Sequence, residues 1–197
     1  MDLRPPIPAE AFSELQEELL RRPLTVNHYR KRVGDGRSQT FGVVNRRCAP
    51  IDYSRQCWVR PYLYKLLLDF AAQYVDISYN AITVNQNYQA GPHYDRGNEG
   101  DSFLVAFGDY TGGELRIATG PSLGLKDIRH QPIVGNFSTT LHSVEPFQGQ
   151  RFSLVFYTLR GTPPLPPPSV VLQEGKWRFK RGEEVCRGLP HPKRKVK

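Results

Sequence analysis

The sequence predicts an α+β protein whose β part is a sandwich or a jelly-roll barrel. Two observations indicate this class: helical periodicity is confined to about residues 8–75, and short β-type segments bounded by turn residues fill about residues 80–160. The chain has 197 residues, of which 39% are hydrophobic, enough to bury one core. We therefore expect a single domain over residues 1–160.

Two helices are expected, at Pro8–Leu20 and Pro61–Tyr74. In each, apolar residues recur three and four positions apart, which places them on one face. These residues are Phe12, Leu15 and Leu19 in the first helix and Leu63, Leu66, Leu67 and Phe70 in the second. The first helix has its acidic residues early and Arg21 and Arg22 late, as the helix dipole favours, and Pro61 suits the first turn of the second helix.

Segments rich in β-branched and aromatic residues begin at residue 82. They are Ile82–Tyr88, Ser102–Phe107, Glu114–Ile117 and Arg151–Thr158. Gly, Asp, Asn and Pro clusters separate them, and the glycines of Gly108–Gly113 can supply the positive φ of a tight turn. Short strands at such intervals after two helices favour the sandwich or the jelly roll.

The C-terminal part has a different composition. Gly161–Pro168 contains five prolines, which favour polyproline II, so we expect a rigid linker over residues 161–168. Residues 169–197 are predicted to be a basic C-terminal appendage or a disordered tail. Pro192–Lys195 resembles a nuclear import signal, although a nonspecific electrostatic arm would have the same composition.

Several classes of protein are disfavoured by the sequence. It has no run of about 18 apolar residues, and its N-terminus lacks a basic segment leading into an apolar one, so we expect neither a membrane span nor a secretory signal. Cys48, Cys57 and Cys186 are odd in number and widely spaced, which argues against a disulfide framework and a zinc ribbon. A soluble intracellular protein with reduced thiols is expected, and its oligomeric state stays unknown.

The net charge of +8 is concentrated in two flanks. Residues 21–47 carry eight bases and one acid, residues 176–197 carry nine bases and two acids, and residues 48–175 are nearly balanced. The aromatic residues interleaved with the bases are Tyr29, Phe41, Trp177 and Phe179. Basic runs that neutralise phosphates, with aromatic rings that stack on bases, predict a nucleic-acid partner such as DNA. The alternative is that the charge runs are solvated faces.

The segment Gly91–Gly100 places His93 and Asp95 two residues apart. In an extended chain these side chains project to the same face, so they would point at one spot. His142, just upstream of a predicted strand, can supply a third ligand. Two histidines and one carboxylate on one side of a metal leave positions open for a co-substrate and dioxygen, which is the facial triad of non-haem Fe(II) oxygenases.

Arg151 and Ser153 begin the predicted strand Arg151–Thr158 and share one of its faces. A guanidinium can hold a carboxylate through two hydrogen bonds, and a hydroxyl can be a further donor. The pair therefore suits the distal carboxylate of 2-oxoglutarate, whose other end would chelate the iron.

These motifs resemble those of a known superfamily. The run from His93-Tyr-Asp95 through Gly112-Gly113-Glu-Leu to His142 and Arg151-Phe-Ser153 looks like the double-stranded β-helix core of the Fe(II)/2-oxoglutarate-dependent dioxygenases. Within it, the segments most similar to the TET/JBP-like oxygenase domain are Asn85-Gln-Asn87, Gly97-Asn98 and the run from Phe107 to Leu115. The resemblance covers roughly residues 80–160.

The resemblance implies a double-stranded β-helix core with supporting N-terminal helices, and a role for each matching residue. The iron ligands would be His93, Asp95 and His142. Arg151 would pair with the distal carboxylate of 2-oxoglutarate, with Ser153 as a helper. Asn85 or Asn87 would hydrogen-bond the inner carboxylate of the co-substrate, and the residues alone leave open which of the two does so.

Characterised members of the resembled branch modify the 5-methyl group of thymine or 5-methylcytosine in DNA, which implies the same substrate here. Such an enzyme must extract the base from the duplex. The chain departs from the branch in lacking a cysteine-rich zinc region and a recognisable loop for reading a flipped base. Two alternatives stay open: a hydroxylase of a protein side chain, such as prolyl or lysyl, or of a small metabolite, and a catalytically silent nucleic-acid-binding module on the same fold.

Overall fold

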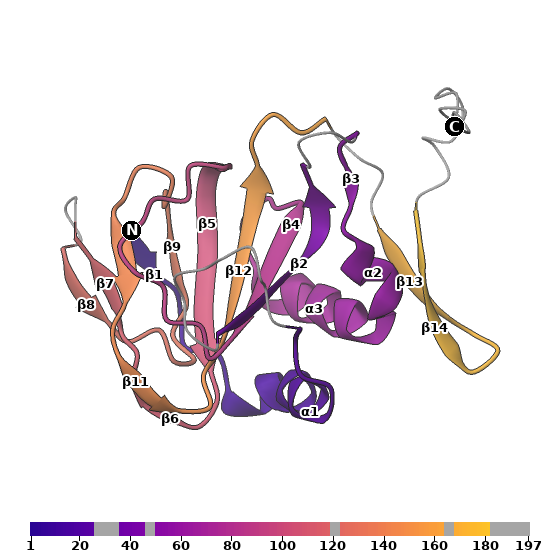
Figure 1. The fold of residues 1–197 in the computed structure, drawn as a ribbon, viewed down its shortest axis with the longest axis horizontal. Coiled ribbons are helices and arrows are strands. Elements are labelled where there is room, and N and C mark those ends of the chain that lie inside the picture. Colours follow the sequence, from indigo (N-terminus) through magenta and orange to yellow (C-terminus); the bar gives the residue numbers. More distant parts are fainter. Residues whose placement is uncertain (26–35, 46–49, 119–122, 164–167, 182–197) are drawn as a thin grey trace, which may run out of the picture.

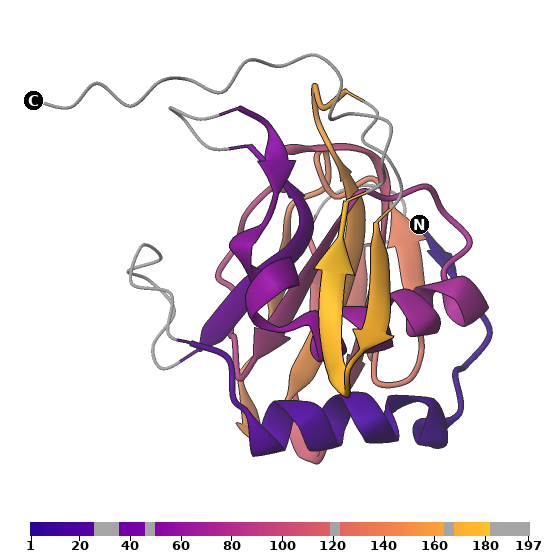
Figure 2. The ribbon, with the colours of Figure 1, turned by 90° about the vertical axis from the view of Figure 1, so that its right-hand side faces the viewer.

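The computed structural model describes residues 1–25, 36–45, 50–118, 123–163 and 168–181. Three layers follow one another in this part of the chain: a small sheet, a large sheet, and helices with a C-terminal hairpin (Figures 1 and 2). In Figure 1 the small sheet lies at the left and the helices at the right of the large sheet. No helix in the described ranges is long and apolar enough to cross a membrane.

The helices lie largely where the periodicity predicts them. They are a 3-10 helix at Ala9–Phe12 (η1), followed by α1 at Ser13–Arg21, α2 at Arg55–Val59 and α3 at Pro61–Tyr74. Helix α3 has the predicted bounds, because Pro61 occupies its first turn and its apolar stripe is buried. The first predicted helix is divided between η1 and α1, and Phe12, Leu15 and Leu19 are its buried hydrophobic residues.

The large sheet is antiparallel and has seven strands in the order β1-β9-β5-β12-β4-β2-β3. They are β1 Asp2–Leu3, β2 Arg37–Val44, β3 Asp52–Tyr53, β4 Ala81–Gln86, β5 Asn98–Phe107, β9 Ile133–Gly135 and β12 Phe152–Leu159. The small sheet has the order β10-β7-β8, with β7 Leu115–Ile117, β8 Gly124–Lys126 and β10 His142–Val144. Two further pairs are β6 Tyr110–Gly112 with β11 Phe147–Gly149, and β13 Ser169–Gln173 with β14 Lys176–Lys180.

The chain alternates between the two sheets. Strands β4, β5, β9 and β12 belong to the large sheet, while β7, β8 and β10 belong to the small one, which His93 extends through a bridge to His142. A predominantly antiparallel protein with few helices is therefore confirmed. The predicted closure into a double-stranded β-helix stays a prediction.

Alternate residues of the central strands face different layers. On β5, the side chains of Phe103, Val105 and Phe107 belong to a core shared with the helices, and those of Leu104 and Ala106 belong to a second core with residues of the small sheet. On β12, the residues in the helix-side core are Phe152, Leu154 and Phe156. The residues between them on β12 therefore face the small sheet, which is the side on which the cavity described below lies.

The C-terminal hairpin corrects one prediction. Phe179 on β14 is only 8% exposed and packs against the rings of Tyr53, Trp58 and Tyr64, and Phe41 on β2 is fully buried. The prediction that Phe41 and Phe179 could stack on nucleic-acid bases is wrong, because both rings belong to the hydrophobic core.

Other predictions lie outside the described residues. These are Tyr29, Cys48, Cys186, residues 164–167 of the predicted linker, and the tail with its resemblance to a nuclear import signal. The predicted domain boundaries and a nuclear location therefore stay predictions.

Replacing Leu154 should destabilise the protein strongly. Its side chain is fully buried between the large sheet and the helices. We expect Leu154→Ala to lower the free energy of unfolding by about 2–5 kcal/mol, measured by urea denaturation. The control is Val155→Ala, whose half-buried side chain lies on the other face of the strand and should lose less stability. Equal losses for the two variants would contradict the assignment of faces.

Candidate active site

The predicted metal ligands come together through the backbone. The N–H of His93 donates to the carbonyl of His142 at 3.0 Å, and the N–H of His142 donates back to the carbonyl of His93 at 3.1 Å. The N–H of Asp95 donates to the carbonyl of Phe137 at 3.0 Å. Residues far apart in the sequence are therefore fixed in register at one edge of the small sheet.

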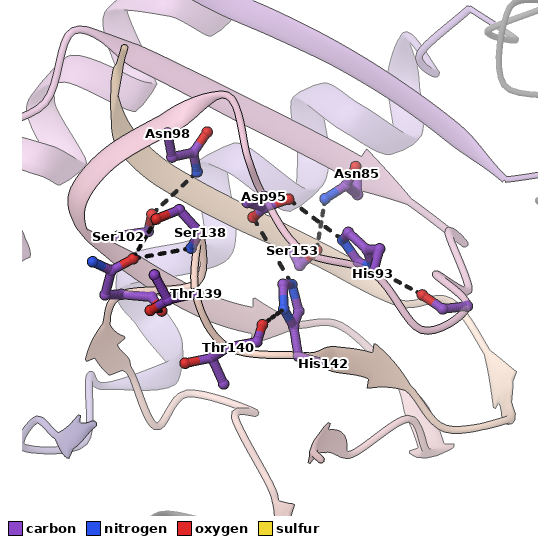
Figure 3. A network of polar contacts seen from close by, with 12 residues as sticks. Asn85, His93, Asp95, Asn98, Ser102, Ser138, Thr139, Thr140, His142 and Ser153 are labelled. Atoms are coloured by element: carbon purple, nitrogen blue, oxygen red, sulfur yellow. Dashed lines mark hydrogen bonds and ion pairs between the residues drawn. The ribbon is translucent and has the colours of Figure 1, made fainter. Parts of the chain in front are cut away.

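The three side chains converge (Figure 3). Nε2 of His93 lies 3.4 Å from Oδ1 of Asp95, and Nε2 of His142 lies 3.9 Å from Oδ2 of the same carboxylate. One ligand atom from each residue lies within 4.8 Å of the other two. These separations let all three atoms reach a single metal ion.

In both histidines, Nδ1 lies beside a backbone carbonyl and Nε2 faces Asp95. Nδ1 of His93 lies 2.8 Å from the carbonyl oxygen of Gly91, and Nδ1 of His142 lies 2.9 Å from that of Thr140. Because a carbonyl can only accept, each Nδ1 carries the proton and each Nε2 offers its lone pair. Burial lowers the pKa of His142, which keeps its imidazole in the neutral form that binds a metal.

Arg151 is buried in the same cavity. Its residue is only 2% exposed, and its Nε and Nη2 have no hydrogen-bond partner among the described residues. Burial also lowers the pKa of this guanidinium, yet an arginine remains charged at neutral pH. A buried charge is tolerated when it is paired, so the site fits an anion such as the distal carboxylate of 2-oxoglutarate.

Gly113 makes room for this arginine. Its φ is +74°, and a Cβ added there would lie 2.9 Å from Nε of Arg151. The predicted turn at Gly108–Gly113 contains the short strand β6, and Gly108, Gly112 and Gly113 have the predicted positive φ. The last of them, Gly113, lets the Arg151 side chain pass beside the backbone.

A second guanidinium lies behind the first. That of Arg129 is 4.3 Å from the centroid of the Tyr110 ring, and that of Arg151 is 5.5 Å from the same centroid. Nε of Arg129 and the hydroxyl of Tyr110 are buried, with no hydrogen-bond partner in the described part of the chain. The sequence did not reveal Arg129 or Tyr110, because only the tertiary fold brings these segments beside Arg151.

The structure separates the roles of the two asparagines. The amide of Asn85 donates to the Ser153 hydroxyl at 3.2 Å, and both side chains line the cavity. Asn87 instead accepts from the backbone N–H of Arg151 at 2.9 Å and donates to Gln150 at 3.3 Å. With a φ of +51°, Asn87 turns the chain after β4. Of the two predicted candidates for the inner carboxylate of the co-substrate, only Asn85 faces the cavity.

The cavity has a volume of about 140 Å³ and lies between the two sheets. Of the described residues that line it, only Asp95 and Arg151 carry a full charge at neutral pH. Seven apolar residues also line it: Ala90, Leu104, Leu115, Ile128, Val144, Leu154 and Val155. They give it the low-dielectric, partly dry interior in which charge-assisted contacts are strongest.

A hydroxyl pair forms another part of the cavity wall. Oγ1 of Thr83 lies 3.3 Å from Oη of Tyr157, and it also lies 3.2 Å from Oγ1 of Thr40 on the neighbouring strand. Asn98, whose amide donates to Ser102 at 3.2 Å (Figure 3), lines the cavity as well. The sequence could have indicated Thr83 and Tyr157 as cavity residues. Thr83 is two residues before Asn85, and Tyr157 is six residues after Arg151, so each is expected on the same strand face as a predicted site residue.

Arg96 and His130 do not line the cavity. Arg96 lies over the ring of Tyr94, with 5.5 Å between the guanidinium carbon and the ring centroid. The ring of His130 stacks on that of Phe12, with 5.1 Å between the ring centroids, so His130 contributes to packing.

The site consists of a His-Asp-His cluster and a buried arginine that line one cavity between two antiparallel sheets. No protein-family model matches the sequence, and no curated protein matches it significantly. Solved structures do match its fold.

NgTET1 in complex with 5mC DNA matches with a TM-score of 0.56 and 16% identity, over 81% of this chain and 72% of that chain. An oxidoreductase of the 2OG-Fe(II) oxygenase family from Burkholderia pseudomallei matches with a TM-score of 0.53 and 15% identity, over 79% and 83% of the two chains. A Pseudomonas putida prolyl-4-hydroxylase matches with a TM-score of 0.50 and 17% identity, over 81% and 92%. At sequence identities this low, the similarity to these three structures shows a shared fold only.

Removing one ligand should abolish metal binding. We expect His142→Ala to lose stoichiometric Fe(II) binding, measured by anaerobic calorimetric titration, because two remaining ligands cannot hold the ion. The matched control is His130→Ala, which removes a histidine that stacks on Phe12 and should leave the stoichiometry unchanged. Retained stoichiometric binding in His142→Ala would refute the site.

The two guanidiniums should contribute unequally to the binding of 2-oxoglutarate by the metal-loaded protein. Arg151→Gln removes a buried charge partner and should weaken binding by about 2 kcal/mol or more, roughly 30-fold. Arg129→Gln removes a half-buried second cation and should weaken it by up to about 1 kcal/mol, roughly fivefold. Isothermal titration measures both effects, with Lys126→Gln, a half-buried lysine that does not line the cavity, as control. An Arg129→Gln variant indistinguishable from this control would remove Arg129 from the site.

Proposed function

We propose that this protein is an Fe(II)/2-oxoglutarate-dependent dioxygenase that hydroxylates the 5-methyl group of pyrimidine bases in DNA. The observation that carries the enzyme class is the buried Arg151, which forms no salt bridge within the described residues and lines the same cavity as the His93, Asp95 and His142 cluster. A metal site alone would suit many proteins, whereas a metal site beside a buried anion-binding arginine suits a dicarboxylate co-substrate.

The overall reaction is balanced: 2-oxoglutarate, dioxygen and a substrate C–H group give succinate, carbon dioxide and a C–OH group. Bound Fe(II) and 2-oxoglutarate together would supply the activation of dioxygen. His93, Asp95 and His142 would occupy one side of the iron and leave the other side open. Arg151 and Ser153 would hold the distal carboxylate, and the Asn85 side chain would orient the end of the co-substrate nearer the metal.

We also infer that the two sheets are the walls of a double-stranded β-helix. The support is the order in which successive segments alternate between them: β4, β5, β9 and β12 on one side, and the His93 bridge, β7, β8 and β10 on the other. In this arrangement the cavity lies inside the barrel, with the metal ligands at one edge.

The neutral hydroxyl groups of Thr83 and Tyr157 in the cavity wall favour the binding of an uncharged substrate group. Thr83, Tyr157 and Asn98 offer hydrogen-bonding groups without charge, and Asp95 is committed to the metal. A lysyl ammonium would therefore find no free carboxylate in the cavity, whereas a pyrimidine base has neutral donors and acceptors on its edge. The fold likeness to NgTET1, solved in complex with 5mC DNA, adds support for this substrate.

Hydroxylation of a prolyl residue in a protein is the second candidate. The similarity of the fold to that of a prolyl-4-hydroxylase favours this candidate. The pyrrolidine ring of proline is uncharged, as a cavity without a free carboxylate requires. The third possibility, a silent binding module, is disfavoured because all three metal ligands meet at one point and Arg151 lies beside them.

The test is incubation of the iron-loaded protein with 2-oxoglutarate, ascorbate and DNA containing 5-methylcytosine or thymine. We expect succinate release and a mass increase of one oxygen on the methylated base, both abolished in His142→Ala. A panel of proline-containing peptides is assayed in parallel. Hydroxylated peptide beside unchanged DNA would establish the second candidate, and no turnover of either would contradict both.

A further inference from the structure

Strand β14 presents a row of cations to solvent. Its inward side chains, Trp177 and Phe179, pack against the helices and loops beneath, and the residues that alternate with them are exposed. These are Lys176, Arg178 and Lys180. Because side chains two positions apart on a strand lie about 7 Å apart on one face, the three charges form a straight, evenly spaced row.

The row has no neutralising partner in the described part of the chain. Lys176, Arg178 and Lys180 form no ion pair there, whereas the neighbouring Arg181 pairs with Asp52 at 2.6 Å. Glu174, in the turn of the hairpin, is the only acid between residues 169 and 181. The surface is therefore positively charged along its whole length.

The hairpin holds this row in a fixed position. Trp177 stacks on Tyr62 with 5.8 Å between ring centroids, and Phe179 contacts Trp58 at 4.6 Å. The turn has a positive φ at both Glu174 and Gly175, as a tight two-residue hairpin connection requires. The strand cannot rotate its charged face inward without withdrawing Phe179 from the core.

The row lies away from the candidate active site. Figures 1 and 2 place β13 and β14 with the helices on one side of the large sheet, and the cavity lies on the other side, between the large and small sheets. A molecule that contacts only this row would therefore not reach His93 or Arg151.

We propose that the outward face of β14 is a docking surface for the phosphate backbone of nucleic acid, separate from the active-site cavity. The phosphates of a nucleic-acid backbone form a regular line of negative charge, and cations at a similar regular spacing are enough to bind them. Lys176, Arg178 and Lys180 form such a line of cations, and among the described residues there is no pocket beside them that would recognise the side chains of a peptide. An acidic peptide would instead present irregularly spaced carboxylates.

The surface acts as a tether. It holds the protein on nucleic acid irrespective of sequence or methylation, and raises the local concentration of substrate around the cavity on the other side. This inference does not depend on DNA being the substrate, because a tethered enzyme could equally act on a protein bound to the same nucleic acid.

The test is the salt dependence of binding to an unmodified DNA duplex, measured by fluorescence anisotropy with the full chain. The triple variant Lys176→Gln/Arg178→Gln/Lys180→Gln should reduce the slope of log affinity against log salt by about 2.7, since each phosphate contact contributes about 0.9. The control variant Arg21→Gln/Arg116→Gln/Lys126→Gln removes the same net charge elsewhere and should change the slope by less than one contact. Circular dichroism melting confirms that both variants fold.

Equal slopes for the two triple variants, or no binding by the wild type, would overturn the proposal. Polyglutamate that displaces the wild-type protein as effectively as DNA of equal charge would also overturn it, in favour of an acidic protein partner. Succinate formation without DNA should be the same in the hairpin variant as in the wild type. Absence of succinate in both would refute the proposed function while leaving the binding result intact.

Discussion

Two backbone hydrogen bonds between His93 and His142 hold together segments that are far apart in the sequence, and the geometry of the site follows from them. The pairing brings the two imidazole rings to 4.3 Å and leaves Asp95 within reach of both. Because side chains alternate along a strand, a slip of one residue would turn one imidazole away from the other. The small sheet fixes this register, since β10 also pairs with β7 through His142 and Ser143.

Two arginines are buried in the part of the chain that the structure describes, and the difference between them bears on function. Arg60 has an anionic partner: its Nη2 lies 3.3 Å from the carboxylate of Glu18 and 2.5 Å from the carbonyl of Arg22. Arg151 is at least as buried and forms no salt bridge within the described residues, although Tyr110 and, at longer range, Asp127 interact with it. Leaving a buried cation unpaired costs several kcal/mol, and a structural role would not explain that cost. Binding of a dicarboxylate would.

Much of the site could be predicted from the sequence because its signals are local. His93 and Asp95 are separated by one residue, and Arg151 directly precedes a strand with strong periodicity to which Ser153 belongs. The bounds of α3 were also predictable, since Pro61 and an uninterrupted apolar stripe define it. In each case a few residues close together in the sequence were enough to predict the feature.

The rest depended on contacts that no local pattern encodes. Strands β8, β9 and β10 have three residues each, too few for periodicity to emerge. Asn85 and Asn87 looked equivalent until the chain was seen to turn at Asn87, where φ is positive. Phe179 was misassigned because it lies within a basic run, although the alternation along β14 already separated it from the exposed bases.

The separation of charge between the two sides of the large sheet has a chemical consequence. Under the proposed function, the cavity would select one small dicarboxylate with one buried guanidinium, that of Arg151, and a second cation near the same tyrosine ring, that of Arg129. If the exposed bases of β14 lined the same cavity, the co-substrate would have several competing partners and no unique orientation. With β14 on the helix side, Arg151 is the only cation that lines the cavity within the described chain. Electrostatic capture of a polyanion and precise placement of a small anion can therefore coexist in a protein of high positive charge.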